Sequence, residues 1–376
     1  MKSPQELKRS KKSLIKTEKG IMVTSAQLNL LNVDSLVRRI RAAKSVILTT
    51  HKQCDGDGLG AVLALYHALK KTGVSVRAIT VDAIPRKYGF LEPQRYLDVF
   101  EGPHKPIEPS DLALIFDTND LRLVEPLFSH LESKCQNVLF VDHHPVLNTG
   151  PEPTPGSYIE TRAASTGEIA YFIIKGLGIH LDEKIAKALY TSISFDTQLF
   201  KFVKNSVNSH LIAAEMLAFV PHAEEIHRHL FSTHTKEKVA FLSKAFGMIE
   251  YFGDGRIAVL KLHRTDITDH NLEMDDSRDV IDMIMNITKL EAAALFREDA
   301  PNEYKLSLRS KGKIEVLGVA EAFAGGGHMF ASGATIFGEY PTIRKKAVDL
   351  ILSRLDSEPA NGDSWDRDGK PKIQPK

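Results

Sequence analysis

The chain has few cysteines, almost no net charge and no long apolar run, and each shortage excludes a class of protein. Two cysteines, Cys54 and Cys135, are too few for a disulfide framework and lack zinc-finger spacing. The formal net charge is +1, so polyanions must bind at a local site rather than through an overall field. No apolar run approaches the ~20 residues that span a bilayer, and no apolar signal core follows the basic N-terminus. We therefore expect a cytoplasmic protein.

The length of 376 residues exceeds one typical core, so two domains are expected. Hydrophobic residues make up 43% and charged residues 26%, which is the balance of a soluble globular protein. The Lys-rich start has too few apolar residues to fold, and an arm that attracts RNA is the alternative interpretation. The expected parts are a polar basic extension (1–28), a first domain (29–234), a connecting helix (235–252), a smaller second domain (253–355) and a disordered tail (356–376).

The order of apolar segments predicts an α/β fold. A strand over 45–50, a helix over 59–71 and a strand over 74–81 form a β-loop-α-β unit, and further strands are expected near 112–117 and 137–142. This order is typical of a doubly wound parallel sheet with helices on both faces. After the connecting helix, strands and helices alternate in a pattern that predicts a compact α+β domain; its expected elements are strands at 256–262, 292–297, 304–309 and 334–337 and helices at 278–286, 316–324 and 343–355.

Carboxylates and imidazoles recur where apolar segments of the first domain end. In open α/β sheets, ligands bind beyond the carboxyl ends of the strands. Charged groups in such places are costly unless they are paired or metal-bound. The segment 45–50 runs into His51, Asp55 and Asp57, the segment 112–116 into Asp117, the segment 138–141 into Asp142, His143 and His144, and the segment 191–195 into Asp196.

Six of these residues have the composition of a centre for two divalent metal ions. Four carboxylates and two imidazoles favour manganese or magnesium over zinc, and paired ions ~3.5–4 Å apart suit phosphoryl transfer. Taken singly, an aspartate after a strand is more often a helix cap or turn residue, and a His-His pair is more often on the surface. The prediction therefore depends on their recurrence in one domain; the six residues are His51, Asp55, Asp57, Asp117, His143 and Asp196.

These segments resemble the DHH phosphoesterase family, whose name is the triplet Asp142-His143-His144. The first family motif is His-x-x-Pro-Asp-x-Asp-x-x-Gly, and residues 51–60 match it except that Cys54 replaces the proline. The segments around Asp117 and Asp196 resemble the second and fourth motifs. Residues 324–333 (Ala-Gly-Gly-Gly-His-Met-Phe-Ala-Ser-Gly) resemble the Gly-Gly-Gly-His signature of the DHH-associated C-terminal domain.

The resemblance implies roles for individual residues. One ion would be held by His51, Asp55 and Asp117, and the other by Asp57, Asp117, His143 and Asp196, with Asp117 bridging. Asp142 would orient a histidine, and His144 would contact the attacked phosphoryl group. Substrate-binding residues are also expected in the second domain. The guanidinium of an arginine is a planar fork for phosphate, and the backbone of the Gly-Gly-Gly-His segment can approach a ligand closely. The expected residues are Arg309, Gly325, Gly326, Gly327 and His328.

Two local alternatives stay open. A glycine triplet alone is more often a flexible turn than a ligand cradle. Arg162, Ser165 and Thr166 start a predicted helix and could bind phosphate, but a capping box with Glu168 also explains Ser165.

The family resemblance implies a manganese-dependent phosphoesterase that cuts short oligoribonucleotides (nano-RNA) to mononucleotides and dephosphorylates 3′-phosphoadenosine 5′-phosphate. One alternative is a cyclic-dinucleotide or linear dinucleotide phosphodiesterase with the same chemistry. An inorganic pyrophosphatase shares the first domain, but the Gly-Gly-Gly-His signature argues against it. A non-catalytic nucleotide-binding or RNA-binding module is the alternative from another class, and the intact ligand set argues against it. The sequence leaves the oligomeric state open, a homodimer included.

Overall fold

The computed structural model describes residues 30–102, 106–147, 150–204, 206–232 and 234–356. Its contacts divide these residues into two compact units. The first unit holds the residues up to Val146 and those from Glu152 to 232, and the second holds the short segment around 150 and the residues from His234 onward. The expected N-terminal extension and nearly all of the expected C-terminal tail lie outside the described residues. No described helix is long and apolar enough to cross a membrane.

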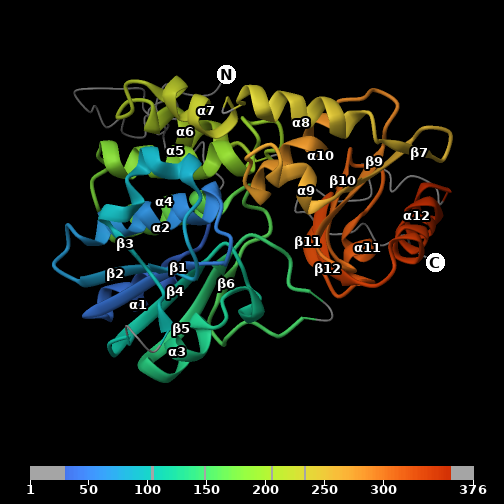
Figure 1. Ribbon diagram of the computed structural model, residues 1–376. Helices are drawn as coiled ribbons and strands as arrows, with labels where there is room; N and C mark the ends of the chain where they lie inside the picture. The colour runs from blue at the N-terminus through green and yellow to red at the C-terminus, as the bar shows by residue number, and fades with distance from the viewer. Residues whose placement is uncertain (1–29, 103–105, 148–149, 205, 233, 357–376) are drawn as a thin grey trace, which may run out of the picture. The chain divides into compact units, whose positions relative to one another are not determined.

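The first unit contains a parallel six-stranded sheet, which confirms the predicted doubly wound arrangement (Figure 1). The strand order is β3-β2-β1-β4-β5-β6. The strands that follow β1 therefore add to one side of the sheet, and the strands that follow β4 add to the other side. A ligand crevice is expected where the order reverses, beyond the carboxyl ends of these two strands. The strands are β1 (Ser45–Thr50), β2 (Ser75–Thr80), β3 (Leu97–Val99), β4 (Ser110–Phe116), β5 (Cys135–Asp142) and β6 (Tyr158–Ile159).

The central strands are apolar on both faces because helices cover both. In β4, Leu112 and Leu114 pack in one hydrophobic cluster with α1, α2, α4 and α5, while Ala113 and Ile115 pack in another with α3. Such continuous apolar runs are typical of parallel strands buried on both faces. The helices are α1 (Asp34–Ala42), α2 (Gly56–Leu69), α3 (Leu127–Lys134), α4 (Thr166–Leu177), α5 (Glu183–Asp196), α6 (Asn208–Met216) and α7 (Ala223–Phe231).

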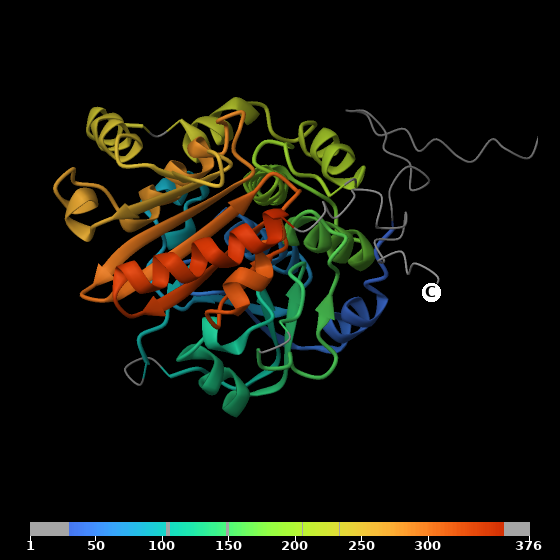
Figure 2. The same ribbon diagram turned by 90° about the vertical axis from the view of Figure 1, so that its right-hand side faces the viewer.

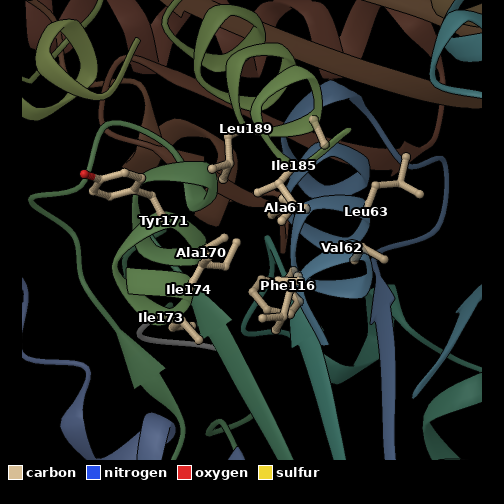
Figure 3. Close-up of a cluster of buried hydrophobic side chains, with 14 of the residues drawn as sticks. Ala61, Val62, Leu63, Phe116, Ala170, Tyr171, Ile173, Ile174, Ile185 and Leu189 are labelled. Carbon is tan, nitrogen blue, oxygen red and sulfur yellow. The ribbon is translucent and has the colours of Figure 1, made fainter. Parts of the chain in front are cut away.

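The helices α2, α4 and α5 pack closely above the sheet, and this packing positions the polar residues at their ends. Figure 3 shows side chains of these three helices around Phe116 at the end of β4. A Cβ atom at Gly60 of α2 would lie 2.6 Å from the Ala188 carbonyl oxygen of α5, so glycine is required for this approach. Consequently the start of α2, with Asp57, lies beside α5, which ends at Asp196.

The second unit is built on a mixed six-stranded sheet in the order β11-β12-β10-β9-β8-β7, in which only the β8–β9 pair is parallel. Helices α8, α9 and α10 pack on one face, and α11 and α12 pack on the other. Figure 2 shows α12 lying across its face of the sheet. The elements are α8 (Lys236–Phe246), β7 (Glu250–Phe252), β8 (Ile257–Leu262), α9 (Arg264–Thr268), α10 (Arg278–Ile284), β9 (Ala292–Ala300), β10 (Glu303–Ser310), α11 (Leu317–Glu321), β11 (Gly326–His328), β12 (Ala331–Phe337) and α12 (Tyr340–Asp356).

Three local expectations were wrong. The apolar segment 191–195 was expected to be a strand like those that precede the other site residues, but it is helical. It lies within α5, where Ile185, Leu189 and Ile193 bury one helical face. The helix expected over 235–252 ends at Phe246, and Glu250–Phe252 forms an edge strand of the second sheet. The helix expected over 316–324 ends at Glu321, because the glycines that follow pair as β11.

Candidate metal centre

The loops after β1 and β4 bring His51 and Asp117 together, with Asp55 nearby. The Nε2 atom of His51 lies 3.5 Å from Oδ2 of Asp117 and 4.0 Å from Oδ1 of Asp55. The Nδ1 atom of His51 lies 2.8 Å from the Lys52 carbonyl oxygen, which can only accept, so Nδ1 carries a proton. Burial lowers the pKa of His51, but the effects of Asp117 and then Asp55 are larger and raise this pKa to about 9. These three residues could hold a metal ion.

Cys54, at the position where the family motif has proline, lies in this first loop. It is buried and is not in a disulfide. A buried free cysteine acts as a small apolar side chain, so it fills the interior here without adding a ligand to the carboxylate and imidazole set.

A second group forms around the fully buried ring of His143 at the end of β5. Its Nε2 atom lies 3.4 Å from Oδ2 of Asp57, 3.6 Å from Oδ1 of Asp117 and 3.7 Å from Oδ2 of Asp196. Three carboxylates from three different elements therefore converge on one ring nitrogen. The ligand atoms of Asp57, His143 and Asp196 lie within 4.8 Å of one another and could hold a metal ion.

Asp117 belongs to both groups, because its two carboxylate oxygens face different imidazoles. Oδ2 faces His51, and Oδ1 faces His143. Its backbone has a φ of 64°, in the left-handed region that few residues other than glycine, asparagine and aspartate adopt. Burial opposes its ionisation, but the contacts with His143 and His51 hold the pKa of Asp117 well below its usual range. Each of its two carboxylate oxygens therefore lies in a different group of candidate ligands.

The crowding of carboxylates shows that the centre is built for positive charge. Burial, and then the charges of Asp117 and Asp196, raise the pKa of Asp57 well above its usual value. Buried charges of like sign are costly unless a counter-charge is present. Carboxylate oxygens with some imidazole are donors that manganese and magnesium accept. The residues therefore fit a divalent metal ion.

Asp142 and His144 adjoin this centre, and Nδ1 of His144 lies 3.7 Å from Oδ1 of Asp117. Oδ1 of the fully buried Asp142 accepts a hydrogen bond from the backbone N–H of His143 at 2.7 Å, and it lies 2.8 Å from Nδ1 of His144. Oδ2 accepts from Nδ2 of Asn119 at 2.7 Å, and the same Asn119 nitrogen donates to the His144 carbonyl at 3.0 Å. Burial lowers the pKa of His144, but the effects of Asp142 and then Asp117 are larger and raise this pKa to about 9. Asp142 thus orients His144 and favours its protonated form.

The start of α4 supplies contacts that the sequence did not predict. Oδ2 and Oδ1 of Asp57 accept from the N–H groups of Thr166 at 2.7 Å and Gly167 at 3.1 Å. Oδ1 also accepts from the Ser192 hydroxyl, and the Thr166 hydroxyl donates to Oδ1 of Asp117 at 3.2 Å. These amides lie at a helix N-terminus, which favours negative charge.

The alternative phosphate site at 162–166 is therefore occupied by side chains of the protein itself. Arg162 pairs with Glu160 at 2.7 Å. The Ser165 hydroxyl accepts from the Glu168 N–H at 3.3 Å, which is the capping interpretation. Thr166 contacts Asp57 and Asp117 as described above. The pattern that could have revealed this is Ser-Thr-x-Glu at a helix start, which predicts the cap but not its carboxylate partners.

Lys204 adds a cation that the sequence did not single out. Its Nζ atom lies 3.3 Å from Nδ1 of His143 and 3.5 Å from the His143 and Thr161 carbonyl oxygens. It lies eight positions after Asp196 in a segment with no motif, so only the folded chain shows that it is near the centre.

In the second unit, Arg309 of β10 is held by a neighbouring helix. Its Nε atom donates to Oδ1 of Asp282 in α10 at 3.1 Å, and Nη1 donates to the Leu308 carbonyl at 3.1 Å. The side chain of Arg309 is 26% exposed. Asp282 had no signal in the sequence, because an acidic residue on a helix is ordinarily solvated. The guanidinium is thus oriented without being fully buried.

Most of the Gly-Gly-Gly-His segment forms a strand rather than the flexible turn that was the alternative interpretation. Gly326–His328 is β11, which pairs antiparallel with β12. A Cβ atom at Gly325 would lie 2.1 Å from the Gly333 carbonyl oxygen, and one at Gly327 would lie 2.7 Å from the Ala331 carbonyl oxygen. Gly327 also has a φ of 128°. Close packing of β11 on β12 therefore requires at least two of the three glycines, whatever ligand they approach.

Comparison with known proteins agrees with these motifs. The sequence matches the DHH family, N-terminal domain, over residues 45–193, and the DHHA1 domain over residues 254–358. It is 26% identical over 294 residues to the bifunctional oligoribonuclease and PAP phosphatase NrnA of Thermus thermophilus, covering 78% of this chain and 84% of that one. The NrnA of Bacillus subtilis is 24% identical over 307 residues, covering 80% and 92%.

A solved structure shows the same fold. It is an exopolyphosphatase-related protein from Bacteroides fragilis, with a TM-score of 0.75 and 22% identity, covering 85% of this chain and 95% of that one. At this identity the likeness concerns the fold alone.

Proposed function

We infer the reaction from the premise that the chain belongs to the DHH family of phosphoesterases. We propose that it hydrolyses short oligoribonucleotides to mononucleotides with two divalent ions, manganese in preference to others. The single observation that carries this proposal is the placement of Asp117, whose two oxygens face His51 and His143. Relatives named oligoribonuclease and PAP phosphatase support the choice of substrate, and we propose 3′-phosphoadenosine 5′-phosphate as a second substrate.

The two groups of side chains would each hold one ion. His51, Asp55 and Asp117 would bind the first, and Asp57, Asp117, His143 and Asp196 the second. When bound, the ions would supply Lewis-acid activation of water and positive charge at the phosphoryl group. The protein contributes fixed ligand positions, through the amides that hold Asp57 and the carbonyl beside Nδ1 of His143.

His144 is the residue proposed to contact the phosphoryl group. Asp142 accepts at Nδ1 of His144, so the Nε2–H on the other side of the ring is directed away from Asp142. A cationic imidazole forms short, charge-assisted hydrogen bonds to phosphate oxygens. We propose that Nε2–H of His144 donates to an oxygen of the attacked phosphoryl group and that Asp142 keeps the ring in that orientation.

The second unit is proposed to grip the far end of the substrate. Arg309 offers a guanidinium held by Asp282, and Gly325 leads into the short, partly exposed strand Gly326–His328. A phosphate bound there would add affinity without entering the chemical step. A cytoplasmic location is part of the proposal, since both cysteines are free thiols and the cytoplasm keeps thiols reduced.

A panel of substrates tests the proposal. Purified full-length protein with manganese is expected to cleave labelled dinucleotides with a kcat/KM about tenfold or more above that for long oligomers, equivalent to ~1.4 kcal/mol. The panel should also contain 3′-phosphoadenosine 5′-phosphate, a cyclic dinucleotide and pyrophosphate, with product identity read by chromatography. The Asp117→Ala protein, prepared in the same way, controls for contaminating nucleases. Preference for pyrophosphate, or binding of dinucleotides without any cleavage, would contradict the proposal.

A further inference from the structure

Residues 163–167, which lead into α4 and begin it, contact three proposed metal ligands that come from three other elements. The Ala163 carbonyl oxygen lies 3.2 Å from Nδ1 of His143. The Thr166 and Gly167 amides hold the carboxylate of Asp57, and the Thr166 hydroxyl donates to Asp117. One short backbone segment therefore determines the orientation of ligands from both proposed ion sites.

The contact with Ala163 selects the protonation of the His143 ring. A carbonyl only accepts, so this contact favours a proton on Nδ1 and a lone pair on Nε2, which faces Asp57, Asp117 and Asp196. The Lys204 ammonium lies 3.3 Å from the same nitrogen and can only donate, so this contact favours the opposite state; with a metal ion on Nε2, Lys204 would donate instead to the His143 and Thr161 carbonyl oxygens, both 3.5 Å away. A histidine must present a lone pair to a metal ion, and the group that accepts from its other nitrogen fixes that state.

Glu168 is the side chain that ties this turn to the rest of the unit. It is fully buried. Its Oε2 atom accepts from the Ala164 N–H at 3.3 Å, and Oε1 accepts from the Ser209 hydroxyl at the start of α6. In a usual capping box the acidic side chain returns to the N-cap amide. Here it reaches one residue further back, to the amide that adjoins the Ala163 carbonyl.

A buried carboxyl group at this position is costly, which argues against a role in packing alone. Burial raises the pKa of Glu168 to about 7. An apolar side chain of similar size would fill the space without that cost. What an apolar side chain would lack is the acceptor for the Ala164 amide, and an unsatisfied buried amide would displace the turn.

We propose that Glu168 is a positioning residue of the metal centre, which acts by holding the Ala163–Gly167 turn against His143, Asp57 and Asp117. The inference rests on the proposed function, since it assumes that these three residues bind metal ions. Residues that orient metal ligands in this way typically change metal affinity about 10- to 100-fold when they are replaced.

The test compares Glu168→Leu with Glu168→Gln in the full-length protein. Leucine keeps the volume but removes both acceptors. Glutamine is also neutral, but its carbonyl accepts from Ala164 and its amide donates to the Ser209 hydroxyl, so it should rescue the contact. We expect the dissociation constant for Mn²⁺, measured by calorimetry on metal-free protein, to rise about 10- to 100-fold in Glu168→Leu and to change only a few-fold in Glu168→Gln.

Glu215→Leu is the matched control. Glu215 lies on α6, as Ser209 does, and its carboxylate is hydrogen-bonded to α4, but its partners there are Tyr171 and Lys175 rather than the turn. Its replacement should leave Mn²⁺ affinity unchanged, and circular dichroism should show that all variants are folded. If Glu168→Leu does not fold, Ser209→Ala removes one partner of the carboxylate and should still weaken Mn²⁺ binding several-fold, while unchanged binding would count against the proposal.

The outcomes separate this inference from the proposed function. Equal Mn²⁺ affinity in wild type and Glu168→Leu, or equal weakening by Glu168→Leu and Glu215→Leu, would overturn the positioning role. Wild-type protein that binds Mn²⁺ but hydrolyses no nucleotide would overturn the proposed function, while a selective loss of affinity in Glu168→Leu would still support the positioning role.

Discussion

Replacement of Asp117 by alanine is expected to lower dinucleotide hydrolysis by about 10³-fold or more, which is ~4 kcal/mol of transition-state stabilisation. Its Oδ2 faces His51 at 3.5 Å and its Oδ1 faces His143 at 3.6 Å. Loss of a ligand that serves both groups should lower metal occupancy at both, whereas loss of Asp55 should affect one. Metal content by mass spectrometry and kcat/KM on a labelled dinucleotide are the two measurements.

The matched control for Asp117→Ala, which changes the residue that follows β4, is Asp111→Ala within β4. Asp111 lies at the opposite end of β4, where its half-buried carboxylate accepts from the Lys44 and Ser45 amides. Its replacement should leave activity and metal content unchanged. Thermal unfolding of both variants shows whether the fold is intact. A loss of only a few-fold in folded Asp117→Ala would rule out the bridging role.

Replacement of Arg309 by alanine is expected to lower kcat/KM on dinucleotides about 30- to 1000-fold. This corresponds to roughly 2–4 kcal/mol for one charge-assisted contact with phosphate. The guanidinium is already oriented by Asp282, so little ordering has to occur when a phosphate binds. Asp282→Asn, which keeps the shape but weakens this orientation, should cause a smaller loss.

The effect of Arg309→Ala should depend on the substrate. A minimal activated phosphodiester without the remote phosphate never uses the contact, so its hydrolysis should fall far less. Metal content should not change, because no proposed ligand lies in the second unit. Equal losses on both substrates would mean that Arg309 supports the chemical centre or the fold, and the proposed grip on the substrate would have to be abandoned.

The sequence predicted the sheet and its polar strand ends because both follow from local patterns. The apolar run 45–50 coincides with β1, and the segment ending at Asp142 coincides with most of β5. Parallel strands buried on both faces leave such runs, and the polar residues that follow them stand out. The structure brings His51, Asp57, Asp117 and His143 together, and their roles as ligands remain a prediction.

The rest depended on tertiary contacts that no local pattern contains. Asp196 was placed after a strand-like segment, but it ends a helix, and only the packing of α5 on α2 brings it to His143. Asn119 and Thr166 have ordinary local explanations as turn and cap residues, and their partners lie on other elements. Gly325 and Gly327 suggested a ligand cradle, but the pairing of β11 with β12 also requires them.

The most direct test of the metal-dependent reaction is the activity of the chain after every metal ion has been removed. The protein is dialysed against chelator until no metal is detected, and hydrolysis of a labelled dinucleotide is followed while Mn²⁺, Mg²⁺ or Zn²⁺ is returned in steps. We predict background activity without metal and recovery that is best with Mn²⁺ and complete at about two ions per chain, as a paired centre requires. Full activity in the demetallated protein, in excess chelator, would contradict the two-ion centre.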